Sequence, residues 1–251
     1  MIVIASLWVT SCEPEKIDFP LSGELISNYR DNADADSLVF PPSAYPYGES
    51  YTNWTVRWMK QFLTYDCSQN PFLNQQNSLF HKDGPVWFLA GLQKEGESVN
   101  VKVPCGKAIL FPLANHLNVL SPCPDQDFAS VFGKRLENTL QEGTLDALSG
   151  VRQLSVEIDG LPVRNPSAYY FASRLFTFTG NPELAICFNP CITGSPQHAV
   201  TSGFYMMLRP LPKGKHTLHY HAEVPELNVI QDGTYYIEVT DWDTKVVKNY
   251  Q

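Results

Sequence analysis

The chain has 251 residues, of which 43% are hydrophobic and 18% are charged, and its formal net charge is −8. This acidic balance argues against a nucleic-acid-binding protein, because phosphate recognition requires clustered Lys and Arg. It also argues against a polybasic contact with a membrane surface. The 19 prolines and 15 glycines predict many turns and short strands rather than long helices.

The N-terminus carries an apolar segment over residues 2–9, followed by Thr10, Ser11 and Cys12. Such a segment is too short to span a bilayer as a helix but has the length of a signal-peptide core. With small residues before the cysteine, it resembles a bacterial lipoprotein signal. The resemblance implies a signal peptide over residues 1–11 and fatty chains on Cys12. The alternative is a buried N-terminal strand followed by a free cysteine.

Several fatty chains on one residue hold a protein firmly to a membrane. We therefore expect a lipid-anchored protein of the bacterial cell envelope, in the outer membrane or at the cell surface, with its folded domain outside the cytoplasm. Residues 12–46 are polar, contain Asp31, Asp34 and Asp36, and end in prolines, which predicts a tether. Residues 47–251 are expected to form a single domain.

The chain contains six cysteines, and disulfides persist in an exported domain. If Cys12 carries lipid, the remaining five leave at least one thiol free or paired with another chain. Cys187 and Cys191 form the first predicted pair, because Asn189 and Pro190 favour a turn between them. Cys105 and Cys123 form the second. A zinc site is the rival interpretation, but no C-x-x-C pair occurs.

Two segments have helical periodicity. In residues 50–65, Trp54, Trp58 and Phe62 recur every four residues and form one apolar stripe. The stripe could be a platform on which Trp54 and Trp58 stack a sugar ligand, but a helix packed on a sheet is the favoured interpretation. Residues 125–142 form the second predicted helix, capped by Asp125 or Asp127.

The remaining apolar segments have the length and pattern of strands. Asp159-Gly160, which follows the strand predicted over residues 154–158, is a strong hairpin signal. Together the strands and the two helices predict a mainly β fold, a β-sandwich of the jelly-roll or Ig-like kind with two packed α-helices. The expected strands cover residues 85–91, 99–103, 107–115, 154–158, 175–179, 204–208, 216–224 and 233–239.

Four sequence blocks occur together, at residues 84–91 (GPVWFLAG), 106–112 (GKAILFP), 202–212 (SGFYMMLRPLP) and 214–219 (GKHTLH). In these blocks the chain resembles a family of exported bacterial proteins, mostly uncharacterised, that share GPVWFLAG-like and PLPxGKHTLH-like motifs. The resemblance covers residues 47–239 and implies an exported β-rich domain without a particular activity. The position of Cys105 departs from the family's pattern, so no disulfide is inferred from it.

Histidines are densest in the strand predicted over residues 216–224. Alternation along a strand places His219, His221 and Glu223 on one face and His216 on the other. The two histidines could bind Zn or Cu if a third ligand were supplied, by Glu223, His116 or His198, but a solvated strand face is favoured.

The sequence contains no nucleophile elbow, no zinc-protease motif and no nucleotide-binding loop. We therefore expect no cofactor and a non-catalytic domain that binds a glycan or another envelope component. The alternative is a carbohydrate-active hydrolase whose acidic residues come from separate loops. A metal-binding envelope protein that uses His219, His221 and Glu223 is the weaker alternative.

Overall fold

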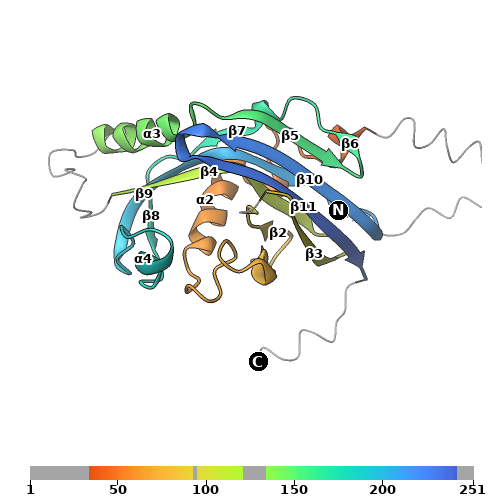
Figure 1. The fold of residues 1–251 in the computed structure, drawn as a ribbon, viewed down its shortest axis with the longest axis horizontal. Coiled ribbons are helices and arrows are strands. Elements are labelled where there is room, and N and C mark those ends of the chain that lie inside the picture. Colours follow the sequence, from red (N-terminus) through yellow and green to blue (C-terminus); the bar gives the residue numbers. More distant parts are fainter. Residues whose placement is uncertain (1–33, 93–94, 121–133, 242–251) are drawn as a thin grey trace, which may run out of the picture.

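The computed structural model describes residues 34–92, 95–120 and 134–241. In this part of the chain two β-sheets pack face to face, with helices on both sides of one of them (Figure 1). The predicted β-sandwich is confirmed.

The described helices are α2 (Tyr51–Phe62), α3 (Lys134–Leu148) and α4 (Leu184–Cys187). The strands are β1 (Leu79–Phe80), β2 (Val86–Leu89), β3 (Glu97–Pro104), β4 (Ala108–Leu120), β5 (Arg152–Ile158), β6 (Leu161–Pro162), β7 (Tyr170–Ala172), β8 (Phe176–Thr179), β9 (Pro196–Leu208), β10 (Gly214–Val224) and β11 (Val229–Thr240). Short 3₁₀ helices cover Ala35–Leu38, Pro46–Gly48, Gln75–Asn77, Pro166–Tyr169 and Pro225–Leu227.

The two sheets have different strand orders. The first, which we call sheet A, runs β1-β2-β4-β9-β7, with β8 also paired to β9. The second, sheet B, runs β3-β11-β10-β5-β6. Most neighbouring strands are antiparallel, and the two parallel pairs are β2 with β4 and β3 with β11. Every strand that the periodicity predicts is present, and within the described residues only the very short β1, β6 and β7 are additional.

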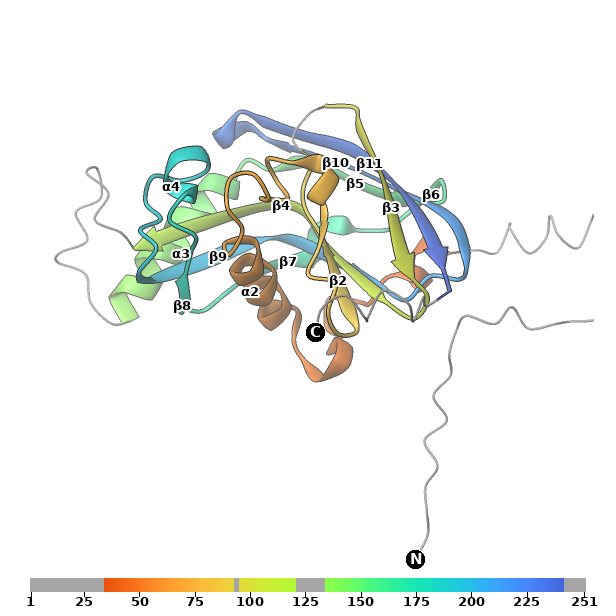
Figure 2. The same ribbon diagram turned by 90° about the horizontal axis from the view of Figure 1, so that it is seen from below.

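Sheet A is covered on both faces, which explains why β4 is almost continuously apolar (Figures 1 and 2). On one face the ring of Trp58 in α2 lies 5.9 Å from that of Tyr205 in β9. On the opposite face Phe111 of β4 lies 6.1 Å from Tyr220 of β10, in sheet B. Helix α3 covers the rest of that second face.

Two buried tyrosines of sheet B form hydrogen bonds with the chain segment that follows β2. The backbone N–H of Leu92 donates to the Tyr220 hydroxyl at 2.7 Å, and the Tyr235 hydroxyl donates to the Ala90 carbonyl at 2.9 Å. Both tyrosines are fully buried, and burial raises the pKa of each phenol above its usual value. These bonds pair backbone groups that would otherwise be buried without a partner.

Helix α2 confirms the helix predicted over residues 50–65, and the Ser50 hydroxyl caps it by accepting from the Asn53 amide at 3.2 Å. Its tryptophans are buried, with Trp54 3% and Trp58 2% exposed. The Trp54 indole donates to the Pro46 carbonyl at 3.0 Å, and the Trp58 indole donates to the Leu89 carbonyl at 2.8 Å. The sugar-stacking role considered for Trp54 and Trp58 is therefore wrong, because both side chains are buried in the core and cannot contact a ligand.

Helix α3 corresponds to the later part of the second predicted helix and continues to Leu148, beyond the predicted end at 142. The extension follows from packing, since Leu148 is buried against Ala222 and Val224 of β10. The predicted caps Asp125 and Asp127 lie outside the described residues. Helix α4 is not predicted, because four residues carry no readable helical period.

The folded domain begins earlier than residue 47. Ala35 and Val39 are each 1% exposed, and the Phe40 amide donates to the Met207 carbonyl at 2.9 Å. Arg164 forms ion pairs with Asp34 and Asp36. The tether predicted over residues 12–46 therefore extends too far, because the segment that begins at Asp34 packs on the folded domain. Asp34 and Asp36, two of the three acidic residues that suggested a solvated linker, are bound to an arginine from a distant part of the chain, and Asp31 lies outside the described residues.

One disulfide joins Cys67, after α2, to Cys187 at the end of α4, with 6.1 Å between the two Cα atoms. The pairing of Cys187 with Cys191 is wrong. The Asn189 side chain accepts a hydrogen bond from the Cys191 amide at 2.9 Å, so Asn189 and Pro190 do form a turn, but α4 directs Cys187 toward the loop after α2.

The other two described cysteines, Cys105 and Cys191, are also disulfide-bonded. Cys12 and Cys123 lie outside the described residues, so the pairing of Cys105 with Cys123 stays a prediction.

We predict that Cys67→Ser or Cys187→Ser lowers the free energy of unfolding by roughly 2–5 kcal/mol, because the crosslink closes a long loop and restricts the unfolded chain. Denaturant titration of the oxidised protein measures this loss. The double variant is expected to lose no more than either single variant. A clearly larger loss in the double variant would show that the two cysteines act independently.

Candidate functional site

The outward face of sheet B is the candidate site, and it arises from strict alternation along three neighbouring strands. Val101, Leu218, Tyr220, Tyr235 and Ile237 point inward and are buried, so the residues between them point outward. We call the resulting surface the polar sheet face. It comprises Ser98, Asn100 and Lys102 of β3, Asp232, Thr234, Tyr236 and Glu238 of β11, and Lys215, Thr217, His219, His221 and Glu223 of β10.

A shallow groove of about 520 Å³ lies at one end of the polar sheet face. Tyr236 lines the groove from the middle one of its three strands and is 47% exposed. The strand register places Asn100 and Thr217 directly beside Tyr236, one on each neighbouring strand. The ring is therefore flanked by hydrogen-bonding side chains on both sides.

The next row of the groove is charged. Glu238 lies between Lys102 and Lys215 in the strand register. The Lys102 ammonium is 3.1 Å from a Glu238 carboxylate oxygen, whereas no ion pair of Lys215 is found among the described residues. The row thus holds two cations and one anion on the solvated surface.

The opposite end of the polar sheet face carries the predicted metal ligands. His219, His221 and Glu223 share one face, as alternation predicts. His219 Nε2 is 3.0 Å from an Asp232 carboxylate oxygen, and Glu223 accepts from Arg152 Nε at 2.6 Å.

The two ring nitrogens of His221 lie 3.8 Å from Asp232 and 4.0 Å from Glu223. Across residues 34–92, 95–120 and 134–241, no group of three or more His, Cys, Asp or Glu side chains could hold a metal ion. The weaker interpretation of His219, His221 and Glu223 as metal ligands therefore finds no support among the described residues. Asp232 is paired with His219, and Glu223 is paired with Arg152.

His216 lies on the other side of β10, as predicted. Its hydrogen-bond partners lie in the turns that flank the strand. Its Nδ1 is 2.8 Å from an Asp159 carboxylate oxygen, and its Nε2 is 2.9 Å from the Pro212 carbonyl oxygen. Both partners can only accept, so both ring nitrogens must donate, which is the state of the imidazolium. The hydrogen bond to Asp159 raises the pKa of His216, and this effect outweighs burial, which lowers the pKa.

Asp159 begins the predicted hairpin turn, with φ of 54° at Asp159 and 78° at Gly160. Burial raises the pKa of its carboxyl group, but hydrogen bonds from His216 and from the Thr217 amide outweigh burial, and the pKa is lowered overall. The Asp159–His216 pair therefore links the β5–β6 hairpin to the start of β10.

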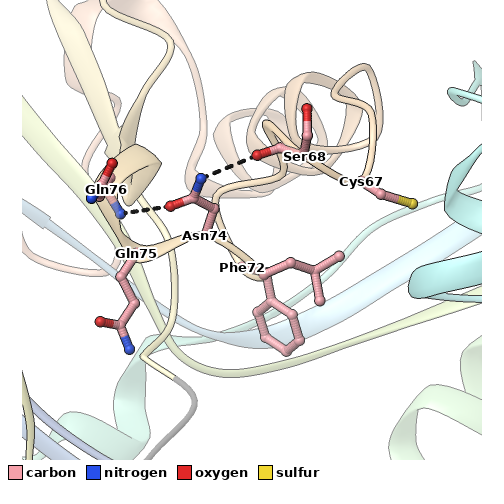
Figure 3. A pocket seen from close by; sticks show the side chains of 7 residues that line it. Cys67, Ser68, Phe72, Asn74, Gln75 and Gln76 are labelled. Atoms are coloured by element: carbon pink, nitrogen blue, oxygen red, sulfur yellow. Dashed lines mark hydrogen bonds between the residues drawn. The ribbon is translucent and has the colours of Figure 1, made fainter.

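A second groove, of about 740 Å³, lies within the loop that follows α2 (Figure 3). Its polar groups hold the loop together. The Asn74 side chain donates to the Ser68 carbonyl and accepts from the Gln76 amide, each at 3.1 Å. Because these groups are used internally, the loop groove is a weaker candidate than the polar sheet face, where Tyr236 and Lys215 face solvent.

Sequence reasoning did not identify Tyr236, Asn100, Thr217, Lys215 or Glu238 as site residues. A usable signal was present in the strand predicted over residues 233–239. Alternation there puts one tyrosine on the side of the strand otherwise occupied by polar residues, and the next residue, Ile237, on the buried side.

No family model matches the chain, and no curated protein matches it. One solved structure is similar, described as "Structure of PbICP-C in complex with falcipain-2", with 11% sequence identity and a TM-score of 0.24. The match covers 62% of this chain and 100% of that chain. A TM-score this low supports no argument about fold or function. The resemblance to exported bacterial proteins therefore stays an expectation.

None of the helices in the described part of the chain is both long enough and apolar enough to cross a bilayer.

We predict that His216→Gln destabilises the protein more at mildly acidic pH than at alkaline pH. A raised folded-state pKa gives stability that is fully present below the unfolded pKa of about 6.5 and is lost as the pH rises through the folded pKa. The lowered pKa of Asp159 gives stability that is present above its unfolded pKa of about 3.9 and is lost as the pH falls through the folded pKa.

Urea titrations of the wild type and the variant, at pH 5.5 and pH 9, measure the difference. Asp159→Asn provides the control background, in which His216→Gln should lose its extra cost at pH 5.5. A cost that is equal at both pH values in the wild-type background would contradict the prediction.

Proposed function

We propose that this chain is a lipid-anchored protein of the bacterial cell envelope whose β-sandwich domain binds a glycan or another polar envelope component without catalysis. The binding surface is the polar sheet face. The observation that carries the proposal is Tyr236, a half-exposed aromatic ring set between the hydrogen-bonding side chains of Asn100 and Thr217.

This arrangement suits the chemistry of a sugar ring. A pyranose has an apolar face of C–H groups and an equatorial edge of hydroxyls, so it fits an aromatic ring with polar neighbours. The rigid sheet holds Tyr236 and its neighbours in place, which limits the entropy lost on binding. Three adjacent strands span about 10 Å, enough for one or two sugar units.

The carboxylates on the polar sheet face favour binding over hydrolysis. A glycosidase requires one carboxylic acid kept protonated beside a second carboxylate. Here Glu238 is paired with Lys102, Asp232 with His219 and Glu223 with Arg152. Each of these carboxylates therefore has a basic side chain as its partner, whereas a glycosidase places its two carboxyl groups on either side of the scissile bond.

The proposed location is supported by the N-terminal sequence and by the cysteines. Cys12 follows the short apolar segment and the small residues of a lipoprotein signal. The Cys67–Cys187 disulfide is typical of domains that mature outside the cytoplasm.

For the anchor, we predict that the full chain expressed in a bacterium incorporates labelled fatty acid and that Cys12→Ser does not. The physical reason is that the thiol of Cys12 is the proposed attachment point. Gel autoradiography of the membrane fraction gives the result, with Cys67→Ser as the matched cysteine control. Equal labelling of the wild type and Cys12→Ser would show that the lipid, if present, is attached elsewhere.

For the binding surface, we predict that the full chain binds at least one polymer in an array of neutral and acidic polysaccharides, and that Tyr236→Ala weakens this binding about tenfold by removing ring stacking. Isothermal titration measures the affinity, and thermal unfolding checks that the variant is folded.

Tyr45→Ala is the matched control, because Tyr45 is 71% exposed but lies outside the polar sheet face. Equal weakening by both substitutions, or no binding to any polymer, would refute the proposed surface. Release of reducing sugar by the wild-type protein would refute the non-catalytic part of the proposal in favour of a hydrolase.

A further inference from the structure

We propose that the polar sheet face selects an acidic glycan, a polymer of uronic acids or other carboxylated sugars, whose carboxylate binds Lys215. This inference rests on the proposed function and names the class of ligand for the same surface. Its basis is the charged row of the groove, Lys102, Glu238 and Lys215.

The charges in this row leave one cation available. Glu238 is opposite Lys102 on one side and Lys215 on the other. Its carboxylate is 3.1 Å from the Lys102 ammonium, which neutralises it. Among the described residues no ion pair of Lys215 is found, and Lys215 is exposed. The row therefore carries one uncompensated positive charge, and it lies on the wall of the groove.

The position of Lys215 matches the place where a sugar carboxylate would project. Lys215 is two residues from Thr217 on the same face of β10, a separation of about 7 Å along the strand. Thr217 lies beside Tyr236 in the register. A lysine side chain reaches about 6 Å from its Cα, so its ammonium can meet a carboxylate on a ring that stacks on Tyr236.

The charges on the rest of the polar sheet face favour binding at the end that carries Lys102 and Lys215. His219 and His221 are the titratable groups at the other end, together with Asp232, Glu223 and the neighbouring Arg152. Asp232 and Glu223 place two carboxylates at that end, against the single guanidinium of Arg152, which disfavours an anionic polymer there. The net charge of −8 also opposes a polyanion at long range, so selection must come from close contact with Lys215 rather than from general attraction.

The test compares polygalacturonate, alginate and hyaluronan with the carboxyl-reduced form of each, using the full chain. The wild type should bind at least one acidic polymer about twofold to fivefold more tightly than its neutral form, the range of an exposed ion pair. Lys215→Gln should abolish this preference. Lys215→Arg should keep it, and Glu238→Gln should increase it by releasing Lys102.

Equal affinity for the acidic and neutral forms, or a preference that survives Lys215→Gln, would overturn this inference and leave the proposed binding function standing. Failure to bind either form of any polymer would overturn both. Thermal unfolding of each variant identifies loss of fold. Because Glu238→Gln and Lys215→Gln are expected to act in opposite directions, general destabilisation cannot produce the expected pattern.

Discussion

Two buried tyrosine hydroxyls hold the sandwich in register, and the polar sheet face depends on them. Tyr220 and Tyr235 reach from sheet B to the backbone of Leu92 and Ala90, at the end of the first sequence block (residues 84–91). A slip of β10 or β11 by one residue would break these bonds and reverse which side chains point inward. Histidines, lysines and carboxylates would then be buried without partners, at a cost far larger than that of the hydrogen bonds alone. The hydrophobic core thus also fixes the composition of the solvated surface.

Much of the fold could be predicted because each element has a local period. The four-residue recurrence of Trp54, Trp58 and Phe62 identifies α2, and short apolar runs between turns identify the strands. The disulfide partner of Cys187 could not be predicted from spacing, because it is 120 residues away and becomes a neighbour only after the chain folds. Local turn chemistry around Asn189 is real, but it does not determine where a cysteine points.

The candidate site was predictable only in part, for a related reason. Alternation correctly places His219, His221 and Glu223 on one face, but it says nothing about Asp232 and Arg152 on the neighbouring strands. With those partners, the histidines and Glu223 belong to a network of polar contacts on the sheet surface. Tyr236 was overlooked because an aromatic residue in a strand is usually a core residue. Its exposure becomes clear only when its neighbour Tyr235 is seen to occupy the buried side.

The packing of the segment that begins at Asp34 has a consequence for the proposed lipid anchor. If fatty chains hold Cys12, about 22 residues separate it from Asp34, and a chain of that length spans at most about 75 Å. The longer linker suggested by the acidic sequence would have allowed roughly 115 Å. Because Arg164 holds Asp34 and Asp36 against the domain, the volume that the binding surface can explore is several times smaller. Such a short connection to a lipid anchor would favour polymers that lie close to the bilayer. It would also raise the effective concentration of those polymers at the polar sheet face.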